Sequence, residues 1–115
     1  RAAAAMAPLP GVITPFPGGV CRSGSKVGAN KYKSLHASTA EAYCPTLRDQ
    51  VKSELVAGTN CAYEIVIDGV DELAIAAAMR AAAEAAAGDG VLAISASNYG
   101  GKLGKYAFHM HDLFK

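Results

Sequence analysis

The chain has 115 residues, a formal net charge of +1 at pH 7, and 51% hydrophobic against 18% charged residues. This composition predicts one compact domain, because the apolar content is too high for wholesale disorder and the length too small for a two-domain enzyme. The near-neutral charge argues against a nucleic-acid binder, which would show a clustered basic surface. No apolar run approaches the length of a membrane span. We therefore expect neither nucleic acid nor membrane as a partner.

The three cysteines, Cys21, Cys44 and Cys61, are widely spaced and form no C-x-x-C pair. Neither a disulfide framework nor a structural zinc site is therefore predicted, and a reducing, cytoplasmic location is expected. The chain opens with Arg1 and a run of alanines, without the residue order of a signal peptide. We interpret it as a piece of a longer product.

In the first half of the chain, helices and strands are predicted mainly from the prolines and glycines that end them. The alanine-rich residues 1–7 are interpreted as the tail of a helix that the following prolines stop. A strand is expected at 11–14. Residues 15–30, rich in glycine and proline, predict a long loop of the kind that compact domains keep for function. Beyond it we expect a short strand near Leu35 and a short helix over 45–55.

The block from 61 to 96 carries the clearest signals. Its β-branched and aromatic residues 62–68 predict a strand. Asp71 is a good N-cap for a helix over 72–87, and Gly88 supplies its stop. Residues 91–96 predict a second buried strand.

The order of these elements predicts an α+β fold. Helix, strand, long loop, strand, helix and strand match a ferredoxin-like split βαβ sandwich, which has an antiparallel sheet with helices on one face. Because the first strand is missing, the fold is expected to be incomplete at its N-terminus. Alternating side chains over 105–111 predict an extra edge strand.

Glu64 is the candidate catalytic residue. In a strand it shares a face with Val66 and Asp68, while Tyr63 and Ile65 take the other face. If both faces are covered, the carboxyl loses water and can hold and pass a proton near neutral pH. The alternative is an exposed strand face on which Glu64 is simply solvated.

Two glycine-rich segments are candidate substrate contacts. The loop 17–28 offers backbone N–H groups, hydroxyls and cations for an anion or the polar rim of a heterocycle, although it misses the spacing of a nucleotide-binding loop. The turn 98–104 leaves a predicted strand end, where ligands of α/β sheets often bind. Each segment has a plain structural alternative, a loop or a hairpin turn. The candidate residues are Arg22, Ser23, Ser25, Lys26, Asn98, Tyr99 and Lys102.

No metal site is predicted. His109 and His111 share a face of the expected last strand, but without a third ligand they are interpreted as surface or interface histidines. Cys44 has neither a helix N-terminus nor a paired histidine, so a nucleophilic thiol is not favoured.

Four motifs occur in order along the chain and together resemble one family. They are Gly11-Val-Ile-Thr-Pro-Phe-Pro-Gly-Gly-Val with Arg22-Ser-Gly-Ser-Lys, Glu41-Ala-Tyr-Cys-Pro-Thr-Leu-Arg48, Tyr63-Glu-Ile-Val-Ile-Asp-Gly69, and Ile94-Ser-Ala-Ser-Asn-Tyr-Gly-Gly-Lys-Leu-Gly104. The chain resembles the formylmethanofuran:tetrahydromethanopterin N-formyltransferases over nearly its whole length, from about Pro8. The resemblance assigns residues 1–115 to the C-terminal, or distal, lobe.

The resemblance implies an enzyme of one-carbon metabolism. Such a transferase moves a formyl group between the amine of methanofuran, or a related furan cofactor, and N5 of tetrahydromethanopterin. It implies no permanently bound cofactor and no metal, because both carriers are substrates. It also implies that Glu64 is the buried proton shuttle and that the two glycine-rich segments contact substrate. One departure is Ser97, which stands where the family has a small glycine.

The resemblance also implies partners. The proximal lobe of the same protein would be missing, so the isolated piece is expected to be inactive. The whole protein is expected to be a dimer or tetramer, or a subunit of a methylotroph formyltransferase/hydrolase complex. A non-catalytic ferredoxin-like assembly or ligand-binding module within such a complex is the alternative, and a free-standing small-ligand sensor is disfavoured by the missing first strand.

Overall fold

A computed structural model describes two compact units of the chain. The described residues are 1–22, 43–45, 48–50, 52–97 and 104–115. The first unit comprises Arg1–Cys21, Ile65–Ser97 and Tyr106–Lys115, and the second comprises Arg22–Glu64 and Asn98–Lys105.

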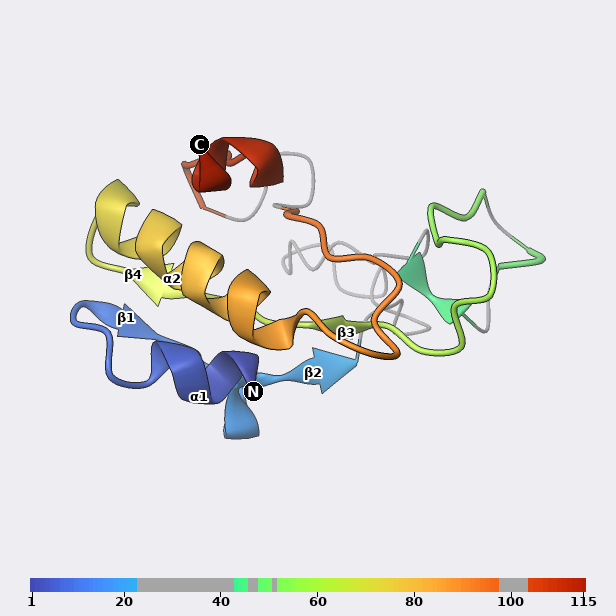
Figure 1. The fold of residues 1–115 in the computed structure, drawn as a ribbon, viewed down its shortest axis with the longest axis horizontal. Helices are drawn as coiled ribbons and strands as arrows, with labels where there is room; N and C mark the ends of the chain where they lie inside the picture. The colour runs from blue at the N-terminus through green and yellow to red at the C-terminus, as the bar shows by residue number, and fades with distance from the viewer. Residues whose placement is uncertain (23–42, 46–47, 51, 98–103) are drawn as a thin grey trace, which may run out of the picture. The chain divides into compact units, whose positions relative to one another are not determined.

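Two helices form the centre of the first unit. α1 (Ala2–Met6) and α2 (Glu72–Ala86) lie side by side, as Figure 1 shows. Both confirm the sequence predictions. Asp71 begins α2 as predicted, because its Oδ1 accepts a hydrogen bond of 2.8 Å from the Ala74 N–H. An alanine-rich sequence with a capped start is sufficient to place this helix.

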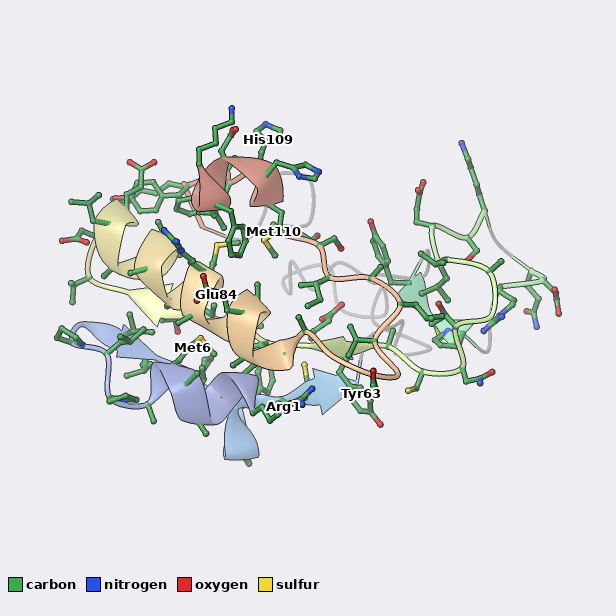
Figure 2. The ribbon with its side chains drawn as sticks, viewed as in Figure 1. Arg1, Met6, Tyr63, Glu84, His109 and Met110 are labelled. Atoms are coloured by element: carbon green, nitrogen blue, oxygen red, sulfur yellow. The ribbon has the colours of Figure 1, made fainter. Side chains whose placement is uncertain are left out.

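The core of the first unit is built mainly from alanine. Its buried members are Ala2, Met6, Ala78 and Ala82, and Ala78 is completely inaccessible. Alanine has no side chain beyond Cβ, so the two helices approach closely. Among the described residues, Met6 is the one large side chain that is fully buried in this core (Figure 2). Burial of this one methionine contributes about 1.5–3 kcal/mol of hydrophobic stabilisation.

A two-stranded antiparallel sheet lies against these helices. β1 (Val12–Ile13) pairs with β4 (Asp68–Gly69), so that Val12 is opposite Gly69 and Ile13 opposite Asp68. Position 69 has no room for a side chain, because a Cβ on Gly69 would lie 2.5 Å from Cγ1 of Ile75 on α2. The face of the sheet that carries Val12 and Gly69 is therefore the face that the helices cover.

The region between β1 and the second unit is less irregular than the sequence predicts. A short 3-10 helix, η1 (Pro17–Gly19), follows β1, and β2 (Cys21–Arg22) comes directly after it. β2 pairs with β3 (Tyr63–Glu64) to form a second two-stranded sheet. The loop predicted from residue 15 onward thus contains ordered elements. The strand predicted over 62–68 is present only at its two ends, as β3 and as the start of β4.

The C-terminal segment folds as a helix and not as the predicted strand. η5 (Met110–Phe114) is a 3-10 helix that packs on α2, where the Arg80 guanidinium lies 5.7 Å from the centre of the Phe114 ring. Hydrogen bonds between residues three apart, such as Asp112 N–H to the His109 carbonyl at 2.9 Å, hold the turn. The edge strand expected over 105–111 is therefore wrong.

Two further predicted elements are absent from the described residues. Residues 91–96 form no strand, and Val91 and Leu92 are 42% and 56% exposed. A strand needs a partner, and the two sheets found among the described residues offer this segment none. The described part of 45–55 contains no α-helix, because the Arg48 N–H bonds three residues back, to the Pro45 carbonyl, in a tight turn. The strand predicted near Leu35 lies outside the described residues.

The structure is a small α+β arrangement with antiparallel strand pairing, in agreement with the coarse fold prediction. Within the described part of the chain, no helix has the length and apolar character that crossing a membrane requires.

Candidate active site

The second sheet brings together two of the predicted site residues. Arg22 lies on β2 and Glu64 on β3, and these two strands are hydrogen-bonded neighbours. Residues more than forty positions apart in the sequence therefore meet at one short sheet. The pairing places a cationic and an acidic residue on adjacent strands, which is the composition expected of a site that handles a polar substrate.

Glu64 is half-buried. Its neighbour Tyr63 is 64% exposed, as the alternation of side chains along a strand predicts for residues on opposite faces. The prediction of a buried carboxylate is thus met only partly, because Glu64 keeps some access to water. A carboxylate in this position can accept a proton from one group and return it to another when both groups lie within hydrogen-bonding distance.

The other predicted substrate contacts cannot be compared with the structure. They lie outside the described residues and are Ser23, Ser25, Lys26, Asn98, Tyr99 and Lys102. Together with Arg22 and Glu64, all eight predicted site residues fall within the chain segments of the second unit. The candidate site and the alanine core therefore belong to different units.

Arg48 is a residue whose importance the sequence analysis missed. Its Nε donates a hydrogen bond of 3.1 Å to the Pro45 carbonyl, and its Nη2 donates to the Thr59 carbonyl. Hydrogen bonds from a charged donor are among the stronger ones in proteins. The side chain thus joins Pro45 to the segment that leads into β3. Its place at the end of the second family motif, Glu41–Arg48, was the signal that could have identified it.

In the part of the chain that the structure describes, the histidines and cysteines form no cluster that could hold a metal. His109 precedes η5 and His111 lies within it, so the shared strand face on which a metal was considered does not exist. Figure 2 shows His109 at the N-terminal end of η5. No group of three or more metal-ligating side chains occurs among the described residues. Cys21 and Cys44 are half-buried and Cys61 is exposed.

A groove of about 250 Å³ lies between α1 and β1, within the first unit. Its lining residues are Ala3, Met6, Ala7, Val12, Ile13 and Thr14. Thr14 supplies the only polar side chain, and the lining contains no acid, base or cation. A groove of this kind cannot perform proton transfer or orient a charged substrate. It is therefore not a candidate catalytic centre.

Comparison with known proteins identifies the family. A family model described as "FTR, proximal lobe" matches residues 1–113. The chain therefore belongs to the formylmethanofuran–tetrahydromethanopterin formyltransferase family. This confirms the family resemblance, while the description of the matching model names the proximal lobe where the sequence analysis expected the distal one.

Curated relatives agree with this assignment. The chain is 57% identical to the formylmethanofuran–tetrahydromethanopterin formyltransferase of Methanosarcina mazei, over 96% of this chain and 38% of that protein. It is 56% identical to the enzyme of the same name from Rhodopirellula baltica, over 95% of this chain and 34% of that protein. The chain thus spans little more than a third of the length of these relatives.

Two solved structures share the fold. One is the formyltransferase from Methanosarcina barkeri, with a TM-score of 0.81 and 55% identity over 98% of this chain and 39% of that one. The other is a formyltransferase/hydrolase complex from Methylorubrum extorquens with methylofuran, with a TM-score of 0.77 and 46% identity over 99% of this chain and 38% of that one. With 55% and 46% identical residues, these structures share the family of this chain as well as its fold.

Proposed function

We propose that this chain is one lobe of an enzyme that transfers a formyl group between the amine of methanofuran, or a related furan, and N5 of tetrahydromethanopterin. The observation that carries the proposal is the family match over residues 1–113, together with relatives that bear this activity in their names. The description of the matching model supports the proximal lobe, in place of the distal lobe expected from the sequence. A ferredoxin-like arrangement of the lobe within the whole protein is part of the proposal.

The chemistry requires a proton to move between two nitrogens. The attacking amine adds to the formyl carbon and gives a tetrahedral intermediate, and its nitrogen must lose a proton. The departing amine nitrogen must gain one when its bond to that carbon breaks. We assign Glu64 to both transfers, because its half-buried carboxylate on β3 can accept the first proton and return it to the second nitrogen.

The proposed substrate contacts remain those predicted from the sequence, whereas the partner within the same polypeptide becomes the other lobe in place of the proximal one. Arg22 on β2 supports the assignment of substrate binding to the segment it begins, because β2 pairs with the strand of Glu64. In this proposal methanofuran and tetrahydromethanopterin are substrates, and no permanent cofactor is required. The likeness to a formyltransferase/hydrolase complex supports membership of an oligomer or of such a complex. A cytoplasmic location is proposed from the cysteine pattern alone.

The same likeness favours a second candidate function. In this alternative the lobe is a non-catalytic assembly or ligand-binding module of a multienzyme complex. The two functions differ in what they demand of Glu64. A catalytic lobe needs the carboxylate, whereas an assembly module does not.

A substitution in the full-length natural protein distinguishes the two functions. Glu64→Gln preserves size and removes the ionisable oxygen, so loss of the proton shuttle should lower the formyl-transfer rate by about 10²-fold or more. Glu54→Gln is the matched control, because Glu54 is an exposed carboxylate in the same unit. Full activity in Glu64→Gln would support the assembly module, and an inactive full-length wild-type protein would overturn the proposed enzyme function.

A further inference from the structure

The Arg48 side chain bonds to two backbone carbonyls of the second unit at once. Its Nε donates to the Pro45 carbonyl at 3.1 Å, and its Nη2 donates to the Thr59 carbonyl, 11 positions further along the chain. A guanidinium is planar and its N–H groups point in fixed directions, so two acceptors bonded to one guanidinium are fixed relative to each other. The Arg48 N–H bonds to the same Pro45 carbonyl, so the link to Thr59 is what the side chain alone contributes.

Thr59 begins the segment that leads into the strand of Glu64. Its own N–H bonds back to the Val56 carbonyl at 3.1 Å, which closes a turn over residues 57 and 58. Residues 59–62 form neither helix nor strand before β3 begins at Tyr63. A segment outside a helix or sheet takes its course from individual hydrogen bonds to its backbone groups. The bond from Arg48 therefore fixes the start of the approach to Glu64.

The surroundings of this link strengthen it. Pro45, Arg48 and Thr59 are all half-buried, so water competes less for these bonds than it would on an open surface. The donor is charged, and hydrogen bonds from charged donors are stronger than those between neutral groups. All of these residues belong to the same unit as Glu64. Arg48 can therefore influence Glu64 through the backbone of one compact unit.

We propose that Arg48 is a positioning residue for the proton shuttle. It holds the Thr59 carbonyl to the Pro45 carbonyl, and this sets where the Glu64 carboxylate lies relative to the two nitrogens that exchange the proton. Misplacement of a catalytic group by about 1 Å can lower a rate by about 10²-fold, so a small change in this segment is sufficient to slow transfer. The inference rests on the proposed function, in which Glu64 carries the proton.

A double-mutant cycle in the full-length natural protein tests the proposal. Arg48→Met removes the guanidinium donors and keeps an unbranched side chain. It should lower kcat for formyl transfer by about tenfold or more and leave KM within about twofold of the wild-type value. When Glu64→Gln is already present, Arg48→Met should lower kcat no further, because no proton shuttle remains to be positioned.

Two further variants sharpen the cycle. Arg48→Lys keeps the positive charge, but one ammonium cannot reproduce the fork of a guanidinium, so its kcat should fall between those of wild type and Arg48→Met. This variant also supplies the test if Arg48→Met does not fold. Lys52→Met is the control, because it removes an exposed cation from the same unit and should change neither kcat nor KM.

Several outcomes would overturn the positioning role. A wild-type kcat in Arg48→Met or in Arg48→Lys would show that the link to Thr59 is not needed for transfer. An equal loss of kcat from Arg48→Met with and without Glu64→Gln would make Arg48 a structural residue that does not act through Glu64. Both results leave the proposed function standing, whereas an inactive full-length wild-type protein would overturn the proposed function itself.

Discussion

The interactions inside the first unit differ in kind from those inside the second. Every fully buried hydrophobic side chain among the described residues lies in the first unit, where α1 and α2 meet through alanines and Met6. In the second unit, the described contacts include the pairing of the strands that carry Arg22 and Glu64 and the hydrogen bonds of Arg48 to backbone carbonyls. The first unit thus supplies apolar packing, whereas polar contacts organise the unit that contains the candidate site.

This difference explains what substitutions should do in each unit. A change in the first unit should alter the free energy of unfolding without touching the chemistry, because its groove has no catalytic side chain. A change in the second unit should alter activity or local order around β3 and leave the helix pair intact. Substitutions in the full-length natural protein can separate these two kinds of effect.

Met6→Ala should produce the largest loss of stability. Met6 is 2% exposed and is the largest fully buried side chain among the described residues, so its truncation leaves a cavity and should cost about 2–5 kcal/mol. Urea denaturation followed by circular dichroism at 222 nm measures the change. A shift of the midpoint no larger than that of Ala4→Gly, at an exposed position on α1, would contradict the assigned core.

Arg48→Met should loosen the segment that leads into β3. Removal of two hydrogen bonds from a charged donor should cost about 1.5–3 kcal/mol locally, so amide hydrogen exchange should rise over residues 59–64. Exchange in α2 should stay unchanged. If Arg48 positions Glu64, kcat for formyl transfer should fall more than KM rises.

Arg80→Met is the matched control for Arg48→Met. Arg80 is half-exposed, and its ion pair with Glu84 at 3.2 Å lies on the surface of α2, where such pairs contribute at most about 1 kcal/mol. Equal exchange profiles in the Arg48 and Arg80 variants would show that Arg48 does not order the approach to β3.

Ala78→Leu should destabilise the helix pair through overpacking. Ala78 is completely buried, so three added carbon atoms have no space and should cost about 1–3 kcal/mol. Ala77→Leu makes the same change at the preceding, exposed position and should have almost no effect. Thermal unfolding of the two variants side by side provides the measurement, and identical melting temperatures would refute the close approach of α1 and α2.

Asp71→Ala should have the smallest effect of the series. It removes the carboxylate that accepts the 2.8 Å bond from the Ala74 N–H, and loss of such a cap costs about 0.5–2 kcal/mol. Asp71→Ser retains an acceptor and should recover most of the stability. If the alanine and serine variants melt at the same temperature, the cap does not contribute as described.

The sequence predicted those elements whose signals are local. α1, β1 and α2 were found because alanine content, prolines, Asp71 and Gly88 act within one or two turns of chain. The strands over 91–96 and 105–111 were wrong, because a strand exists only where a distant segment supplies hydrogen bonds. η5 instead satisfies its backbone locally and packs Phe114 under Arg80.

The candidate site was predictable only in part for the same reason. The residue types at Arg22 and Glu64 pointed to polar chemistry, but the pairing of β2 with β3 that joins them is a long-range contact. Arg48 was missed because its bonds go to backbone carbonyls, whose positions no residue pattern records.

The proton-shuttle role of Glu64 is tested by the formyl-transfer rate of Glu64→Gln beside wild type and Glu54→Gln, in the full-length natural protein. A loss of about 10²-fold or more is expected in Glu64→Gln alone, with unchanged circular dichroism and melting temperature. Wild-type activity in Glu64→Gln would contradict the proton shuttle and would leave this lobe as a scaffold for chemistry performed elsewhere in the protein.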